Sequence, residues 1–182
     1  MLWLNGTDWS IALRESLLVW PALEASHVMT LMLFVGTILV VDLRLMGVLF
    51  TKTPISAIDR KVLPLTMLGF GILVVTGVLL FYAKPLTYYN NFYFRIKLII
   101  IALAMINIVV FHFRVQHNQE KWDNAEKPPK SARMIALISL TSWILVVIVG
   151  RLIAYGDWFH CQTLDDGGIF YVFQDCPQLG GH

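Results

Sequence analysis

Three side chains whose chemistry suits a cofactor site stand beside long apolar segments, where ionisable groups are costly. His27 opens the first segment, Lys97 lies at the start of the third, and Arg151 lies near the end of the fourth. A neutral imidazole that projects into a helical bundle is a common axial ligand of haem iron, and cations can pair with the haem propionates. The pattern therefore predicts one haem b with His27 as its axial ligand.

Further ionisable groups fall at the same level if the segments run alternately up and down. Glu24 lies one helical turn before the predicted ligand, and Tyr155 lies one turn after Arg151. The residues predicted to contact the cofactor are therefore Glu24, Arg95, Lys97, Arg151 and Tyr155. The three cations among them would pair with the haem propionates. Lys97 could instead be a second ligand or a proton donor. The competing interpretation is a structural lock without a cofactor, in which Glu24 pairs with Arg151 or Lys97.

Two other histidines are weaker candidates for metal ligands. His112 follows Lys97 by fifteen residues, which is about 22 Å along a helix axis, so it cannot share an iron with His27. It could form a second haem site at the other end of the bundle, or simply lie at the membrane boundary. His160 follows the fourth apolar segment closely and could complete, together with His27, the coordination of the haem iron.

The composition indicates which elements position these residues. The chain has 182 residues, of which 57% are hydrophobic and only 14% charged, and its mean hydropathy of +0.67 is typical of membrane proteins. We expect an all-α protein in which residues 1–182 form a single membrane domain. Its four-transmembrane-helix bundle is predicted at residues 26–50, 62–83, 93–114 and 132–156, segments that are long enough to span and lack the alternation of barrel strands.

The N-terminal residues precede the first predicted span and differ from it in pattern. Apolar side chains at helical spacing predict an amphipathic interfacial helix over residues 1–22, lying on the membrane surface. Residues 5–8 offer candidates for its N-cap, and Pro21 suits a bend into the first span. The apolar stripe of this helix consists of Trp9, Leu13, Leu17 and Trp20.

The distribution of basic residues predicts the orientation, because cytoplasmic loops are enriched in Lys and Arg. Nine of the 14 lie on the side that holds the first-to-second and third-to-fourth connections. We therefore expect a multi-pass protein of the bacterial inner membrane with periplasmic N- and C-termini. The nine are Arg44, Lys52, Arg60, Lys61, Arg114, Lys121, Lys127, Lys130 and Arg133.

Both cysteines, Cys161 and Cys176, lie in the tail at residues 157–182. If this tail is periplasmic, its oxidising surroundings permit a disulfide. Such a bridge would staple a short hairpin-like cap and contribute about 3 kcal/mol. The alternative is a pair of free thiols.

Several short segments carry a resemblance to a known family over nearly the whole chain. They lie at residues 42–47 (DLRLMG), 76–81 (TGVLLF), 94–98 (FRIKL) and 150–155 (GRLIAY), together with His27 at the opening of the first span. This set resembles a family of bacterial four-helix integral membrane proteins that has no assigned activity. The resemblance implies the same fold and leaves the function open.

More distantly, the His of the first span and the Lys of the third are similar to those of HemJ-type protoporphyrinogen oxidases and copper-resistance D membrane proteins. In the HemJ type these residues are the key ones and a b-type haem is bound, which implies such roles for His27 and Lys97. The chain departs from that pattern in its N-terminal helix, its Asp42 and Arg44 pair, and its cysteine-bearing tail.

The leading hypothesis is a b-type haem protein that transfers electrons between a periplasmic partner and quinone or another membrane subunit. An alternative is a cofactor-free structural or assembly subunit of a larger membrane complex, and a further one is a HemJ-like porphyrinogen oxidase, so whether the protein is an enzyme stays open. A net charge of +2 without a basic stripe argues against a nucleic-acid partner. A homo-oligomer is compatible with all three hypotheses.

Overall fold

The computed structural model describes residues 2–114, 122–123, 125 and 128–154. All regular secondary structure within these residues is helical. The helices are α1 (Leu2–Asn5), α2 (Asp8–Glu15), α3 (Val19–Leu45), α4 (Ile55–Ala83), α5 (Pro85–Tyr89), α6 (Phe92–Arg114) and α7 (Lys130–Leu152).

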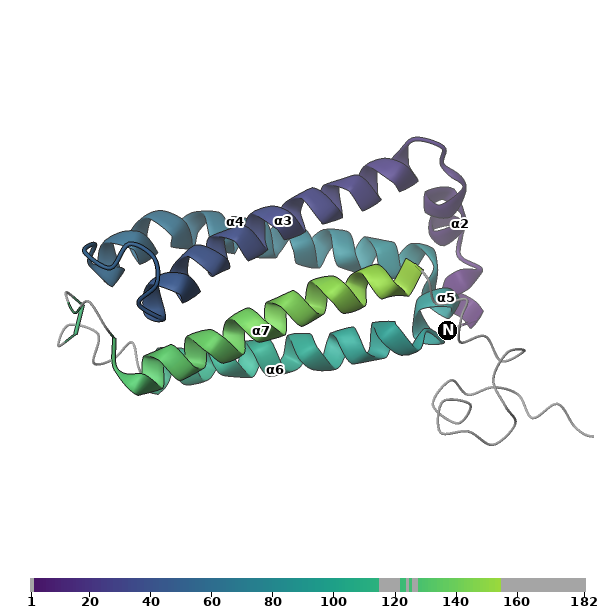
Figure 1. Ribbon diagram of the computed structural model, residues 1–182. Helices are drawn as coiled ribbons and strands as arrows, with labels where there is room; N and C mark the ends of the chain where they lie inside the picture. Colours follow the sequence, from purple (N-terminus) through teal and green to yellow (C-terminus); the bar gives the residue numbers. More distant parts are fainter. Residues whose placement is uncertain (1, 115–121, 124, 126–127, 155–182) are drawn as a thin grey trace, which may run out of the picture.

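Four helices of the described part, α3, α4, α6 and α7, are long and apolar enough to cross a membrane. They lie side by side as one bundle (Figure 1). Many of their large apolar side chains point outward, for example Met29, Val75 and Ile99, which are 71%, 59% and 61% exposed. Lipid accepts such a surface and water does not. The prediction of an all-α, multi-pass membrane protein is therefore confirmed.

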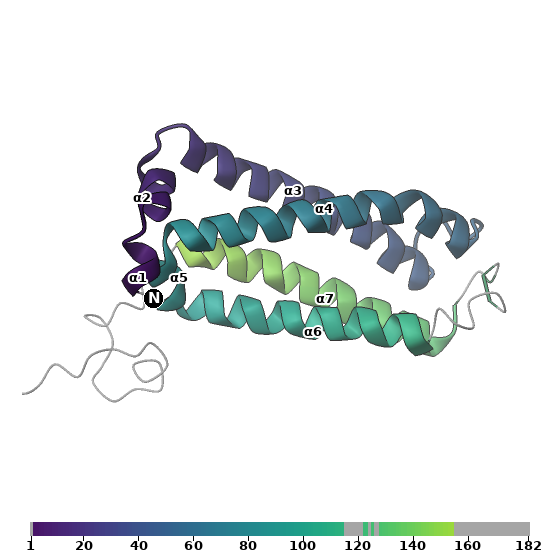
Figure 2. The same cartoon turned by 180° about the vertical axis from the view of Figure 1, so that it is seen from behind.

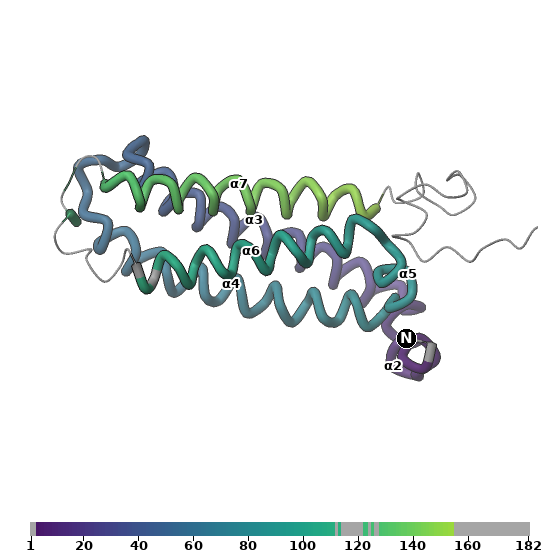
Figure 3. Tube along the Cα trace, turned by 90° about the horizontal axis from the view of Figure 1, so that it is seen from below, coloured from purple at the N-terminus to yellow at the C-terminus, as the bar shows by residue number. Residues whose placement is uncertain are grey.

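The bundle packs as two antiparallel helix pairs. Helix α3 packs against α4, α6 packs against α7, and α3 joins the pairs through α7 (Figures 1 and 3). One end of the bundle, here called the α5 end, carries α1, α2 and α5, while the other, the Arg44 end, carries the α3–α4 and α6–α7 connections (Figure 2). The buried core is small and consists of one cluster around Phe34 and Trp143 and another around Leu45 and Ala136.

Helix α3 begins and ends earlier than the predicted span at residues 26–50. It starts at Val19 because Pro21 falls in its first turn, where a missing N–H costs nothing. It stops at Leu45 because Gly47 adopts a φ of 75°. The Val48 N–H then donates to the Leu43 carbonyl at 3.0 Å, and the Gly47 N–H donates to the carbonyl of Arg44 at 3.0 Å. This pair of bonds is the Schellman motif that ends many helices at glycine.

Helix α4 begins at Ile55, well before the predicted residue 62. Pro54 precedes its first turn, and Asp123 from the α6–α7 connection accepts a hydrogen bond from the Ser56 N–H at 2.8 Å. The cap therefore comes from a residue distant in sequence, which no local pattern could indicate.

The N-terminal segment is not one continuous helix over residues 1–22. It divides into α1 and α2, and Thr7 caps α2 by accepting a hydrogen bond from the Ser10 N–H at 3.4 Å. Ser10 is buried and donates its hydroxyl proton to the Ala83 carbonyl at 3.1 Å, which fastens α2 to the end of α4. Trp9 points outward and is 77% exposed. Attachment of this face to a membrane surface stays a prediction.

The predicted C-terminal cap at residues 157–182 lies outside the described residues. The disulfide between Cys161 and Cys176 therefore stays a prediction, as does any role of Tyr155 and His160.

Candidate functional site

His27 lies on α3 near the α5 end and points toward α4, where its Nδ1 lies 2.8 Å from the hydroxyl oxygen of Thr76. The Thr76 hydroxyl has one proton, and its oxygen lies 2.8 Å from the Ile72 carbonyl of its own helix, to which it donates. With its proton on that carbonyl, the hydroxyl oxygen accepts from the imidazole, and Nδ1 of the neutral ring then carries the proton. The lone pair of His27 is left on Nε2.

Two glycines make room for the polar side chains at this level. A Cβ added to Gly77 on α4 would lie 3.4 Å from Cε1 of His27, and one added to Gly150 on α7 would lie 3.4 Å from Nζ of Lys97. An alanine Cβ would just make van der Waals contact at either position, and a longer side chain would press on the imidazole or on the ammonium group. The sequence analysis assigned no contact to Gly150.

Lys97 on α6 is partly buried, and its charge acts on the imidazole of His27. Its ammonium has no hydrogen-bond or ion-pair partner among the described residues. A cation and an imidazole from non-consecutive helices therefore face a common region near the α5 end. The structure thus brings together two of the predicted site residues.

The other predicted residues of the site are placed differently. Arg95 lies on another side of α6 from Lys97, and its Nε donates to the Tyr89 carbonyl at 2.9 Å. Its guanidinium also lies 5.0 Å from the centroid of the Tyr89 ring. Arg151 is exposed at the end of α7. His112 lies toward the other end of α6 from Lys97, as its sequence spacing requires, and its side chain lies outside the described part.

Glu24 is exposed on α3 and forms no ion pair with Lys97 within the described residues. Its charge instead acts on Tyr88 of α5. Burial first, and then the carboxylate of Glu24, raise the pKa of the Tyr88 phenol. The described residues thus show no pairing of Glu24 with Lys97, and the alternative pairing of Glu24 with Arg151 stays a prediction.

The chain matches one protein family over residues 19–156, which is more than half of its length. It belongs to DUF6644, a family of unknown function. The match includes His27, Thr76, Lys97 and Gly150, whereas α1 and α2 precede it. No curated protein and no solved structure matches the chain. The expected membership of a family without an assigned activity is thus supported, and the more distant resemblance to the HemJ type and to the copper-resistance D proteins stays without support.

The structure of this DUF6644 protein also reveals polar residues that the sequence analysis did not place. Asp42 is only 5% exposed on α3; its carboxyl is hydrogen-bonded to the hydroxyl of Ser139 on α7, and its Oδ2 has no hydrogen-bond partner among the described residues. Trp143 is 3% exposed, and its indole N–H likewise lacks a partner there. Sequence alone gave no signal for the contact of Asp42 with Ser139 or for the burial of Trp143, because both depend on how α3 and α7 are rotated.

Asn107 of α6 is a buried polar residue between two membrane-spanning helices. Its Nδ2 donates to the Ile135 carbonyl of α7 at 3.1 Å, so it joins these helices by a hydrogen bond. It therefore acts in helix packing.

The region between His27 and Lys97 combines three chemical properties. It offers an imidazole nitrogen with a free lone pair, a cation without a partner among the described residues, and surroundings supplied by apolar helices. A nitrogen lone pair can bind a metal centre, and a nearby ammonium can pair with an anionic group of the same ligand. The arrangement suits an anionic ligand that carries a metal.

Proposed function

We propose that this DUF6644 protein is a b-type haem protein of the bacterial inner membrane and that His27 is the axial ligand of the haem iron. The observation that carries the proposal is the hydrogen bond of 2.8 Å between Nδ1 of His27 and the hydroxyl oxygen of Thr76. Histidines that bind metals usually donate their second ring N–H to a neighbouring acceptor, which fixes the tautomer and the orientation of the ring. Thr76 is that acceptor here.

The residues fit this group in number as well as in chemistry. Haem iron takes four nitrogens from its own macrocycle, so a single imidazole can hold it. Lys97 is then available to one propionate, or as a second ligand, and Arg151 lies at the same end of the bundle. Haem when bound supplies a one-electron redox centre. The chain itself would bind the group and orient it through the imidazole of His27.

The proposed role is electron transfer between a periplasmic partner and quinone or another membrane subunit. The excess of Lys and Arg at the Arg44 end supports a cytoplasmic location for that end, and therefore periplasmic termini. The site near the α5 end would then lie close to the periplasmic surface, within reach of such a partner.

The experiment is the absorption spectrum, reduced minus oxidised, of protein purified from haem-replete cells. We expect a haem spectrum for the native chain and its loss for His27→Ala. Ser26→Ala is the matched control, because Ser26 is the exposed neighbour whose hydroxyl bonds only the Ala22 carbonyl of its own helix. A native chain without a haem spectrum, or a His27→Ala chain that keeps it, would contradict the proposal.

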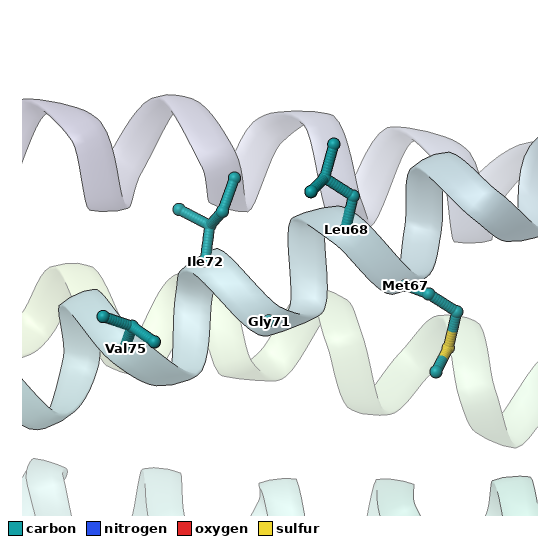
Figure 4. A pocket seen from close by; sticks show the side chains of 5 residues that line it. All are labelled: Met67, Leu68, Gly71, Ile72 and Val75. Carbon is teal, nitrogen blue, oxygen red and sulfur yellow. The ribbon is translucent and has the colours of Figure 1, made fainter.

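A second candidate function is a cofactor-free subunit of a larger membrane complex, and one observation favours it. A Cβ added at Gly36 or at Gly71 would meet nothing within 4 Å, so neither glycine serves close packing inside the bundle. Gly71 lies in a shallow apolar groove of about 370 Å³ on α4, together with Met67, Leu68 and Val75 (Figure 4). Such a groove suits contact with a helix of another subunit.

This candidate is tested by copurification of membrane proteins from mild detergent. Gly71→Leu is expected to release a bound subunit, whereas Val78→Leu, at an exposed site on the same helix, is the control. Recovery of a chain without any partner, in wild type and variants alike, would argue against it.

A further inference from the structure

A groove at the Arg44 end combines two exposed cations with exposed apolar side chains. It has a volume of about 460 Å³ and lies between the end of α3 and the start of α7. Its lining residues are Met46, Val48, Lys130, Arg133, Met134 and Leu137. This groove lies far from His27 and Lys97, at the opposite end of the bundle.

The two cations of the groove are available for a ligand. Lys130 and Arg133 are both exposed, and neither side chain has a hydrogen-bond or ion-pair partner among the described residues. Helix α7 begins at Lys130 after Pro129, without a side-chain cap, so the positive end of its dipole faces the same place. All three features favour an anion.

The apolar wall of the groove continues from these cations toward the middle of the bundle. Leu137 lies seven residues beyond Lys130, which is about 10 Å along the helix axis. Val48, Met134 and Leu137 are 68%, 64% and 55% exposed. The Schellman motif at Gly47 holds Val48 beside this wall. The groove is therefore cationic at the end of the bundle and apolar toward its middle. A lipid bound there would have its headgroup at the end of the bundle and its acyl chain toward the middle.

We propose that this groove is a binding site for an anionic phospholipid. The phosphate pairs with Lys130 and Arg133, and one acyl chain lies along Met134 and Leu137. Charge complementarity selects this occupant, because a basic pocket at the membrane boundary attracts anionic headgroups and a neutral lipid gains nothing from the two cations. The proposal is independent of haem binding.

The test is native mass spectrometry of the purified full chain titrated with phosphatidylglycerol or with phosphatidylcholine. We expect phosphatidylglycerol to bind the native chain more tightly than phosphatidylcholine. The double variant Lys130→Gln/Arg133→Gln should bind phosphatidylglycerol more weakly by a factor on the order of ten. Neither cation has a structural partner in the described part, so the thermal unfolding midpoint should stay unchanged.

The matched control is Arg60→Gln/Lys61→Gln, which removes two exposed cations near the same end of the bundle but outside the groove. It should keep the native affinity. Met134→Trp fills the apolar half and leaves both cations, and it should also weaken binding. Excess inorganic phosphate should not displace the lipid.

Other results would overturn the proposal. Equal losses of phosphatidylglycerol affinity in the groove variant and the control would indicate that the lipid binds through general surface charge. Displacement of the lipid by phosphate would indicate an anion site that holds no acyl chain. Unchanged lipid affinity in Met134→Trp would show that the apolar half of the groove takes no part in binding. A copurifying polypeptide that the groove variant releases, with lipid binding unaffected, would identify a protein as the occupant.

Discussion

Single hydrogen bonds decide the chemistry of the candidate site. Thr76 contacts Nδ1 of His27 and the Ile72 carbonyl through the same hydroxyl, so donation to the carbonyl leaves its oxygen to accept the Nδ1 proton. Lys97 acts on the same imidazole without any partner of its own in the described part. Substitutions of these residues should therefore have separate and measurable consequences.

Thr76→Val should destabilise the protein by about 1–3 kcal/mol, because the Nδ1 proton of His27 then loses its acceptor in a partly buried place. The measurement is the free energy of unfolding in detergent. Thr66→Val is the control on the same helix, since the Thr66 hydroxyl bonds only the Val62 carbonyl at 3.0 Å. Equal effects of the two substitutions would show that the bond to His27 contributes nothing.

Lys97→Met should lower the midpoint potential of the proposed haem by on the order of tens of millivolts, because a nearby cation stabilises the reduced iron. Spectroelectrochemical titration measures this shift. Lys84→Met is the comparison, since the Lys84 ammonium lies over the Trp20 ring, 4.3 Å from its centroid. A potential that does not change in Lys97→Met would place the ammonium away from the haem.

At the scale of the element, the ends of the helices depend on particular backbone conformations. The predicted first span included Gly47, which in fact terminates α3 with a φ of 75°. Gly36 lies inside the same helix with open space around it. The same substitution should therefore have opposite effects at the two glycines.

Gly47→Ala should destabilise the protein by about 1–2 kcal/mol, the cost of placing a Cβ in the left-handed region. Gly36→Ala should instead stabilise α3 by up to about 1 kcal/mol, because alanine is the better helix former. Thermal unfolding midpoints of both variants give the comparison. A loss of stability at Gly36 as large as at Gly47 would contradict this explanation.

At the scale of the whole molecule, Arg44 connects the two helix pairs. It is 1% exposed; its Nε donates to the Thr53 carbonyl at 2.9 Å and its Nη2 donates to the Ala125 carbonyl at 3.2 Å. The first carbonyl belongs to the α3–α4 connection and the second to the α6–α7 connection. One guanidinium thus holds together two connections that are distant in sequence.

Arg44→Leu should destabilise the protein by about 3 kcal/mol, because two charge-assisted hydrogen bonds are lost. It should also speed cleavage of both connections by an added protease. Arg60→Leu, at an exposed site, should change neither quantity. Cleavage of Arg44→Leu at the native rate would show that the two connections are held by other contacts.

The orientation proposed from the basic residues can be checked by labelling in intact cells. In a background with Cys161→Ser and Cys176→Ser, Trp3→Cys should react with a membrane-impermeant maleimide. Lys61→Cys should react only after the membrane is permeabilised. Reaction of Lys61→Cys in intact cells would reverse the topology and place the candidate site on the cytoplasmic side.

The sequence by itself determined the architecture, because four apolar segments of membrane-spanning length leave a chain of 182 residues few alternatives. It also indicated that His27 and Lys97 lie at one level, since antiparallel helices return to the same depth. It could not place Arg95, which donates to the Tyr89 carbonyl of α5, or Glu24, which is exposed and forms no ion pair with Lys97 among the described residues. Rotation of each helix about its axis decides such contacts, and a nearly uniform apolar sequence carries little information on that rotation. Only the tertiary structure therefore paired His27 with Thr76, Asp42 with Ser139, and Arg44 with the two connections.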